Sequence, residues 1–69
     1  MEIHAALARN VRKRRTELGL SQEALADAAG LDRTYISGIE RGLRNPTIEV
    51  VSKLASALQQ QPAALLVIK

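Results

Sequence analysis

The feature that most constrains this fold is a series of short amphipathic stretches, each closed by glycine. Apolar residues recur every three or four positions, which is the period of an α-helix with one buried face. Gly19, Gly30 and Gly42 each follow such a stretch, and glycine accepts the left-handed backbone that ends many helices. The sequence shows no strand-like alternation of apolar and polar residues. The pattern therefore predicts an all-α chain.

Capping residues predict where the helices begin. Ser21, Asp32 and Thr47 each precede an apolar stretch, and their side-chain oxygens can accept hydrogen bonds from the first helical turn. Pro62 suits the first position of a last, short helix. The fourth helix is expected to bury a stripe that begins at Ile48. The five expected helices lie at about residues 3–18, 22–29, 33–41, 48–58 and 62–66.

The core has to be built from aliphatic side chains. The 69 residues are 46% hydrophobic but include no Cys, Phe or Trp, and Tyr35 is the single aromatic residue. So short a chain is expected to form one domain over residues 1–69. The lack of Cys excludes disulfides and thiolate metal sites, which leaves helix packing or dimerisation to supply stability. A cytoplasmic location fits this composition.

Charge and hydropathy narrow the class of function. No apolar run approaches the roughly 20 residues that span a bilayer, so we expect a soluble protein without a membrane partner. The net charge of +3 and the pI of about 10.0 favour a polyanionic partner. The basic run RNVRKRR, residues 9–15, is either a solvated helix face or a source of phosphate contacts. His4 lacks Cys and His neighbours at ligand spacing, so no enzyme, metal or cofactor is expected.

Two short helices around a glycine form the most specific motif, at about residues 22–41. Ala26 is small enough for a second helix to cross closely, and Gly30 permits a sharp turn. Ile36 and Ile39 supply the apolar anchors of the second helix. This combination predicts a helix-turn-helix, the alternative being a generic helical bundle without a nucleic-acid role.

The segment LGLSQEALADAAGLDRTYISGIERGLRNPT, residues 18–47, resembles the phage-repressor and Cro type of helix-turn-helix, or XRE family. Within that family, LDRTYISGIERG is most similar to small controller proteins of restriction-modification systems. The resemblance implies a five-helix, lambda-repressor-like DNA-binding domain. It also implies a sequence-specific transcriptional regulator, a repressor or autoregulator, that binds an operator as a dimer through the major groove. An antitoxin-like or adaptor module with the same fold is the alternative.

The resemblance also implies which residues contact double-stranded DNA. The helix that begins at Arg33 would read base edges, because guanidinium can bond bidentately to guanine O6 and N7. Tyr35 either contacts the DNA backbone or is a half-buried packing residue. The implied base contacts are Arg33, Thr34, Ser37 and Gly38, of which the glycine would permit close approach. The implied backbone contacts are Gln22, Tyr35, Arg41 and Arg44.

One acid stands on an apolar helix face and needs a partner. Glu40 lies about 40° from Ile36 around the expected helix. On the first helix, Arg15 lies four residues after Val11, at the edge of the apolar stripe. The resemblance implies a structural ion pair between Arg15 and Glu40. Arg14 also faces inward and is the alternative partner.

A second copy of the chain is an expected partner, and RNA polymerase is a second candidate. One recognition helix reads too few base pairs to stand out among roughly 10⁶ competing sites, and two subunits on half-sites about 34 Å apart solve that problem. Glu23 and Asp27 are either a solvated acidic pair or, as in some phage repressors, a contact with RNA polymerase. The expected homodimer interface, unless these residues cap the protein's own core, consists of Leu65, Leu66, Val67 and Ile68.

Overall fold

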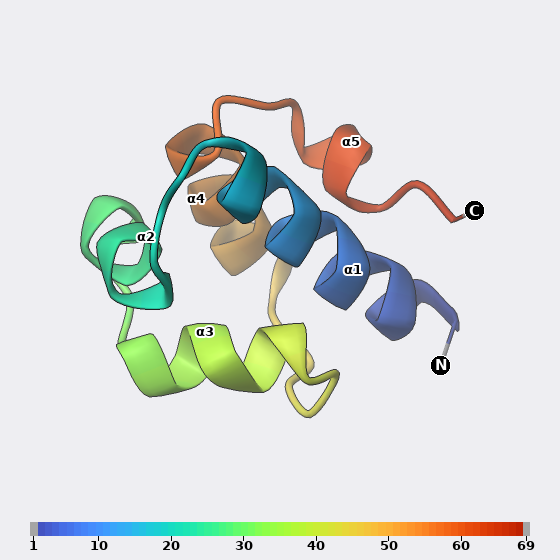
Figure 1. The fold of residues 1–69 in the computed structure, drawn as a ribbon. Helices are drawn as coiled ribbons and strands as arrows, with labels where there is room; N and C mark the ends of the chain where they lie inside the picture. The colour runs from blue at the N-terminus through green and yellow to red at the C-terminus, as the bar shows by residue number, and fades with distance from the viewer. Residues whose placement is uncertain (1, 69) are drawn as a thin grey trace.

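The computed structural model describes residues 2–68, which form five helices and no strand (Figure 1). This confirms the predicted all-α fold, and each helix end lies within one residue of its expected place. The helices are α1 (Glu2–Glu17), α2 (Gln22–Ala29), α3 (Arg33–Glu40), α4 (Ile48–Ala57) and α5 (Pro62–Leu65).

Side-chain caps begin α2, α3 and α4. Ser21 Oγ accepts a hydrogen bond of 2.9 Å from the backbone N–H three residues later. Asp32 Oδ1 accepts one of 2.8 Å from the N–H two residues later, and Thr47 Oγ1 accepts one of 3.2 Å from the N–H three residues later. Each bond satisfies a donor that has no partner inside its helix, so the three predicted caps are confirmed.

A turn closed by two backbone hydrogen bonds reverses the chain after α3. Gly42 has a φ of 72°, in the left-handed region that glycine tolerates best. The N–H of Gly42 donates to the carbonyl of Ile39 at 3.0 Å, and the N–H of Leu43 donates to the carbonyl of Gly38 at 2.8 Å. This Schellman turn satisfies two terminal carbonyls and folds the next residues back over the end of α3.

The turn that ends α4 adopts the same geometry without a glycine. Gln59 has a φ of 59° there, and the N–H of Gln60 donates to the carbonyl of Ala55 at 2.9 Å. A left-handed backbone costs an L-residue roughly 1 to 2 kcal/mol, and the greater freedom of glycine in the unfolded chain offsets part of that cost.

We therefore expect Gln59→Gly to raise the free energy of unfolding by about 0.5 to 1 kcal/mol, measured by urea denaturation. Gln60→Gly is the matched control, because Gln60 lacks a positive φ and glycine there gains nothing. Equal stabilisation by the two substitutions would contradict the explanation from backbone strain.

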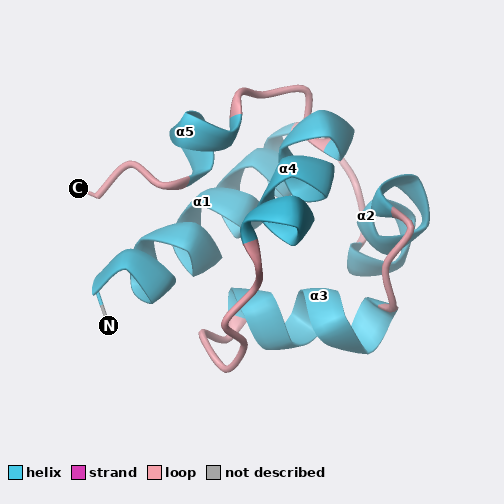
Figure 2. Cartoon of the chain, turned by 180° about the vertical axis from the view of Figure 1, so that it is seen from behind, coloured by secondary structure: helices cyan, strands magenta, loops and turns pink. Residues whose placement is uncertain are grey.

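The core lies where the first four helices meet and is completed by one residue of α5, Leu65. Val11 of α1, Leu25 of α2, Ile36 of α3 and Leu54 of α4 are each 0% exposed. In both views of the ribbon, α1 and α4 lie between α3 at the bottom and α5 at the top (Figures 1 and 2). Helix α5 packs against α1 and α4, while α3 packs against α1 and α2. This arrangement leaves one long side of α3 free of other helices.

Candidate nucleic-acid interface

Helix α3 divides its side chains between the core and an outward face. Its two isoleucines, Ile36 and Ile39, are 0% and 2% exposed and anchor the helix in the core. The polar side chains of the outward face, Arg33, Thr34 and Ser37, are exposed or half-buried, and Arg41, the residue directly after the helix, is exposed. Because the major groove of B-DNA admits an α-helix, these guanidinium and hydroxyl groups form a surface suited to base edges and phosphates.

Gly38 does not lie open on that surface. It is buried, and the side chain of Arg44 from the following loop covers it. A Cβ built on Gly38 would lie 2.8 Å from Arg44 Cγ and 3.0 Å from Arg44 Nε. The structure therefore does not support the predicted base contact by Gly38, because the close approach that this glycine allows is made by Arg44 of the same chain.

Arg44 also reaches Tyr35. Its Cζ lies 5.4 Å from the centroid of the Tyr35 ring, within the distance of a cation–π contact. Tyr35 is half-buried and packs against the hydrophobic core, whereas Arg44 is exposed. Tyr35 thus packs against the core with part of its ring and supports a guanidinium beside α3 with its exposed part.

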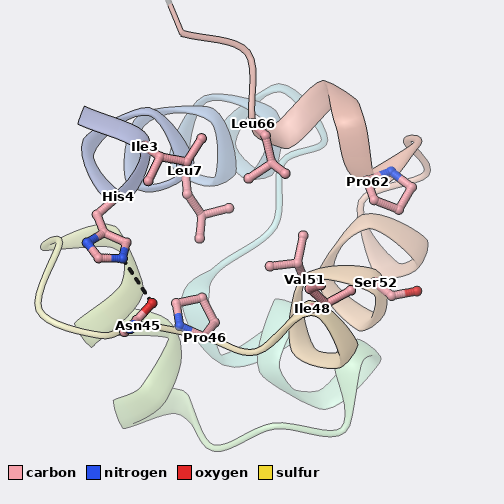
Figure 3. A pocket seen from close by; sticks show the side chains of 10 residues that line it. All are labelled: Ile3, His4, Leu7, Asn45, Pro46, Ile48, Val51, Ser52, Pro62 and Leu66. Carbon is pink, nitrogen blue, oxygen red and sulfur yellow. Dashed lines mark hydrogen bonds between the residues drawn. The ribbon is translucent and has the colours of Figure 1, made fainter. Parts of the chain in front are cut away.

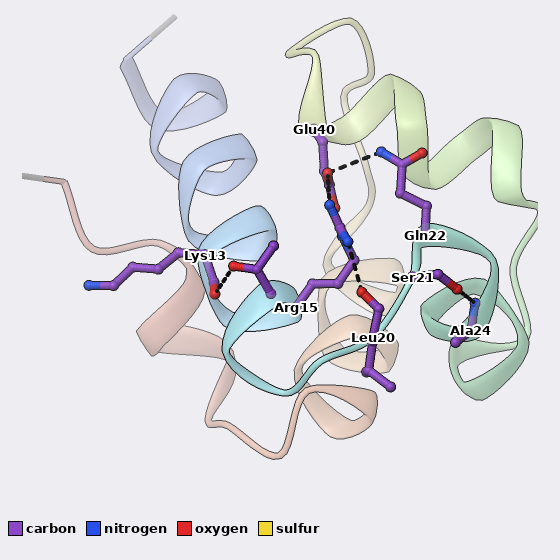
Figure 4. Close-up of polar contacts among 8 residues, drawn as sticks. Lys13, Arg15, Leu20, Ser21, Gln22, Ala24 and Glu40 are labelled. Carbon is purple, nitrogen blue, oxygen red and sulfur yellow. Dashed lines mark hydrogen bonds and ion pairs between the residues drawn. The ribbon is translucent and has the colours of Figure 1, made fainter.

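The acid on the apolar face of α3 is paired with Arg15 (Figure 4). Arg15 Nε donates to Glu40 Oε2 at 2.6 Å, and Nη2 donates to Oε1 at 3.0 Å. Arg15 Nη1 donates to the carbonyl of Leu20 at 2.8 Å. The side chains of Arg15 and Glu40 are only 13% and 3% exposed. The hydrogen bond to Glu40 raises the pKa of Arg15 above its ordinary value, against the lowering effect of burial.

Gln22, at the start of α2, contacts the same carboxylate. Its Nε2 donates to Glu40 Oε1 at 3.1 Å (Figure 4). The amide carries a second N–H, which leaves a donor for a phosphate oxygen. Glu40 therefore joins α1, α2 and α3 at one point.

Arg14, the alternative partner of Glu40, has other contacts. Its Nε donates to the carbonyl of Leu58 at 3.0 Å, at the end of α4. Its Nη1 lies 3.6 Å from Glu17 Oε1, one turn further along α1. Arg14 thus ties α1 to α4. The rest of the basic run, Arg9, Arg12 and Lys13, is exposed on α1.

Leu65 belongs to the core and not to a dimer interface. It is 0% exposed, so the sequence-based assignment of this residue to the interface is wrong for the folded chain. Leu66, Val67 and Ile68 are 37%, 49% and 47% exposed. Asn10, which the sequence analysis did not single out, holds this tail, because its Nδ2 donates to the carbonyl of Leu65 at 2.9 Å and to that of Val67 at 3.0 Å.

An apolar groove of about 450 Å³ opens beside Leu66 (Figure 3). It lies between the beginning of α1, the beginning of α4 and α5, and includes Ile3, Val51 and Pro62. At its edge Ile48 is 88% exposed, although helical periodicity had assigned it to a buried stripe. His4 Nε2 and Asn45 Oδ1, 2.9 Å apart, join α1 to the loop at the other edge.

Neither a cluster of metal ligands nor a membrane-spanning helix occurs among the described residues. Within residues 2–68, no three His, Cys, Asp or Glu side chains gather closely enough to hold a metal ion. No helix in the same range has the length and hydrophobicity needed to span a membrane. Glu23 and Asp27 are exposed on α2.

A helix-turn-helix that turns a polar recognition helix outward defines a class of DNA-binding regulatory proteins. The family model named Helix-turn-helix, HTH_3, matches residues 11–65 of this chain. The chain belongs to the HTH_3 helix-turn-helix family.

Three proteins illustrate what this chain is similar to, and two of them are controller proteins. The control protein C.SmaI of Serratia marcescens is 47% identical over 66 residues, which are 96% of this chain and 79% of that protein. The crystal structure of the hypothetical transcription factor NHTF from Neisseria has a TM-score of 0.93 and 42% identity, covering 96% of this chain and 76% of that one. The restriction-modification controller protein C.Esp1396I, solved as a tetramer with its natural 35 base-pair operator, has a TM-score of 0.87 and 37% identity, covering 94% of this chain and 86% of that one. The predicted family resemblance is confirmed.

Proposed function

We propose that this protein is a transcriptional regulator that binds a specific operator as a dimer and acts as a repressor or autoregulator. The observation that carries the proposal is the outward polar face of α3, on a fold shared at 37% identity with a controller protein bound to its operator. In this proposal α3 enters the major groove and no catalytic step is involved. A regulator of this family is expected to work in the cytoplasm, where its operator would lie.

Base and phosphate contacts come from different parts of the surface. Arg33, in the first turn of α3, donates two hydrogen bonds to a guanine, and Thr34 and Ser37 add contacts to neighbouring base edges. The positions of Gln22, Tyr35, Arg41 and Arg44 around this surface suit contacts with the DNA backbone. Each phosphate that a cation neutralises steepens the salt dependence of log K by about 0.9.

The dimer is built on the apolar groove. Ile48 and Leu66 are exposed apolar residues that line a concave apolar surface, and the exposed Val67 and Ile68 follow Leu66 in the chain. Exposed apolar patches of this kind mark interaction sites in soluble domains. A second copy covers them and places two recognition helices on successive major grooves. Glu23 and Asp27 remain accessible on α2 for contact with RNA polymerase.

Selection of bound sequences from a random pool of double-stranded DNA tests the proposal. We expect enrichment of a two-fold symmetric sequence whose half-sites lie about 10 base pairs apart, with a steep dependence of affinity on salt. A pool that stays random after repeated rounds would reject sequence-specific binding. That result would favour the antitoxin-like or adaptor function, in which the same fold binds a protein.

Arg33→Ala is expected to relax base preference at one position of each half-site. The lost bidentate contact with guanine corresponds to about 1 to 3 kcal/mol of discrimination. Competition binding between the selected operator and single-base variants measures it. Arg41→Ala removes the same charge from the residue that directly follows the helix and should weaken binding to all sequences alike. If both variants lost affinity equally for every sequence, Arg33 would have no role in base readout.

A further inference from the structure

The path of the chain after α3 brings Arg44 onto the recognition helix. The Schellman turn at Gly42 bonds the N–H of Leu43 to the carbonyl of Gly38, so the chain folds back over the last turn of α3. The next side chain, Arg44, then lies across Gly38, with Cγ and Nε at 2.8 and 3.0 Å from the place where a Cβ would be. Any larger residue at this position would occupy the path of the arginine stem.

The far end of the arginine is held as well. Its guanidinium lies 5.4 Å from the centre of the Tyr35 ring. Tyr35 precedes Gly38 by three residues, so both lie on neighbouring turns of the same helix. Gly38 supplies the space for the stem, and Tyr35 supplies the aromatic surface for the charged head.

We propose that Gly38 is a positioning residue that keeps Arg44 in its DNA-binding conformation before DNA arrives. The inference rests on the proposed function, because it takes Arg44 as a backbone contact. Arginine loses more side-chain freedom than most residues when it is fixed. A guanidinium already held at the surface loses less of that freedom on contact with a phosphate, and binding is correspondingly tighter.

This role predicts an unusual response to Gly38→Ala. Replacing glycine by alanine inside a helix raises the equilibrium constant for folding about fivefold. This gain offsets the loss of the contact between Arg44 and Tyr35. The variant should therefore melt no lower than the wild type. Its methyl group nevertheless displaces Arg44, and affinity for DNA should fall roughly two- to tenfold for each bound subunit.

Nuclear magnetic resonance of the free protein tests the positioning step without DNA. In the wild type, the ring current of Tyr35 should shift the Arg44 side-chain protons upfield. The chain has no other aromatic residue except His4, so the assignment is direct. We expect Gly38→Ala to move these protons to ordinary values, as Tyr35→Leu does. Unchanged Arg44 shifts in Gly38→Ala would overturn the proposal.

A double-mutant cycle on the selected operator tests the consequence for binding. If Gly38 acts through Arg44, Gly38→Ala should weaken binding in the wild type and have no effect in an Arg44→Ala background. An equal loss in both backgrounds would show that the new methyl group obstructs DNA directly, and unchanged affinity in the wild-type background would show that Arg44 needs no positioning. Both results overturn the proposal. Absence of any selected operator would instead reject the proposed function, while the resonance experiment still decides the positioning step.

Discussion

Ile48→Glu is expected to convert the proposed dimer to a monomer and to weaken operator binding by about 10² to 10⁴-fold. Ile48 is 88% exposed at the edge of the apolar groove, and a carboxylate there would have to be desolvated when two subunits meet. A monomer presents one recognition helix and cannot bind two half-sites at once. Simultaneous binding raises affinity by about 10² to 10⁴-fold, and this gain is lost. Sedimentation velocity gives the mass in solution, and mobility-shift titration gives the affinity.

The substitution is suited to this test because it should not disturb the monomer. Ile48 is the first residue of α4, where a negative charge interacts favourably with the helix dipole. Leu43→Glu is the matched control for the mass measurement, because Leu43 is 66% exposed but does not line the groove. A dimeric mass for Ile48→Glu would exclude the groove as the interface, and a monomeric mass for both variants would point to a general effect of added charge.

Glu40→Ala is expected to lower the free energy of unfolding by about 3 kcal/mol, a large share of the stability of so small a domain. Glu40 accepts from Arg15 and Gln22, and its side chain is 3% exposed. Removal of the carboxylate leaves the Arg15 guanidinium largely buried with the Leu20 carbonyl as its remaining partner. Urea denaturation measures the change.

Two further variants separate a broken ion pair from simple loss of charge. Asp27→Ala removes an exposed acid from α2 and should change stability by no more than about 0.5 kcal/mol. Arg15→Met combined with Glu40→Leu replaces the pair by apolar side chains of similar size and should recover most of the loss. A Glu40→Ala variant within 1 kcal/mol of the wild type would contradict a structural role for the pair.

Titration of Arg15 does not make the free energy of unfolding depend on pH near neutrality. Glu40 raises the pKa of Arg15 in the folded chain, so the stability gained through Arg15 is fully present below the pKa of an arginine in the unfolded chain, which lies far above neutral pH. That contribution is lost only as the pH rises through the higher, folded value. We therefore expect the difference in free energy of unfolding between the wild type and the Arg15→Met/Glu40→Leu variant, which leaves neither partner of the pair unpaired, to stay constant from pH 6 to pH 9 in urea denaturation.

Local signals in the sequence predicted most of the fold. The caps at Ser21, Asp32 and Thr47 and the turn at Gly42 depend on the chemistry of a few neighbouring residues, which the sequence displays directly. The partner of Glu40 was a harder case, because helical periodicity placed both Arg14 and Arg15 near the core. Only packing of α1 against α3 and α4 distinguishes them, and it sends Arg15 to Glu40 and Arg14 to the end of α4.

Features that depend on how distant segments meet were not predictable in this way. Ile48 fits the apolar period of α4, but its place in the first turn leaves it outside the core. Gly38 lies on the outward side of α3 by periodicity, yet the turn after the helix returns Arg44 over it. Leu65 is one of four consecutive large aliphatic residues, and it alone turns inward because of its place in the short α5.

The hydrogen bond between Gln22 and Glu40 has a mechanical consequence for a complex with DNA. A strand of the duplex held by the second amide N–H of Gln22 would be joined through a single carboxylate to the N-terminal helix. A force on that strand would therefore be transmitted to α1, α2 and α3 together, and not to one surface side chain alone.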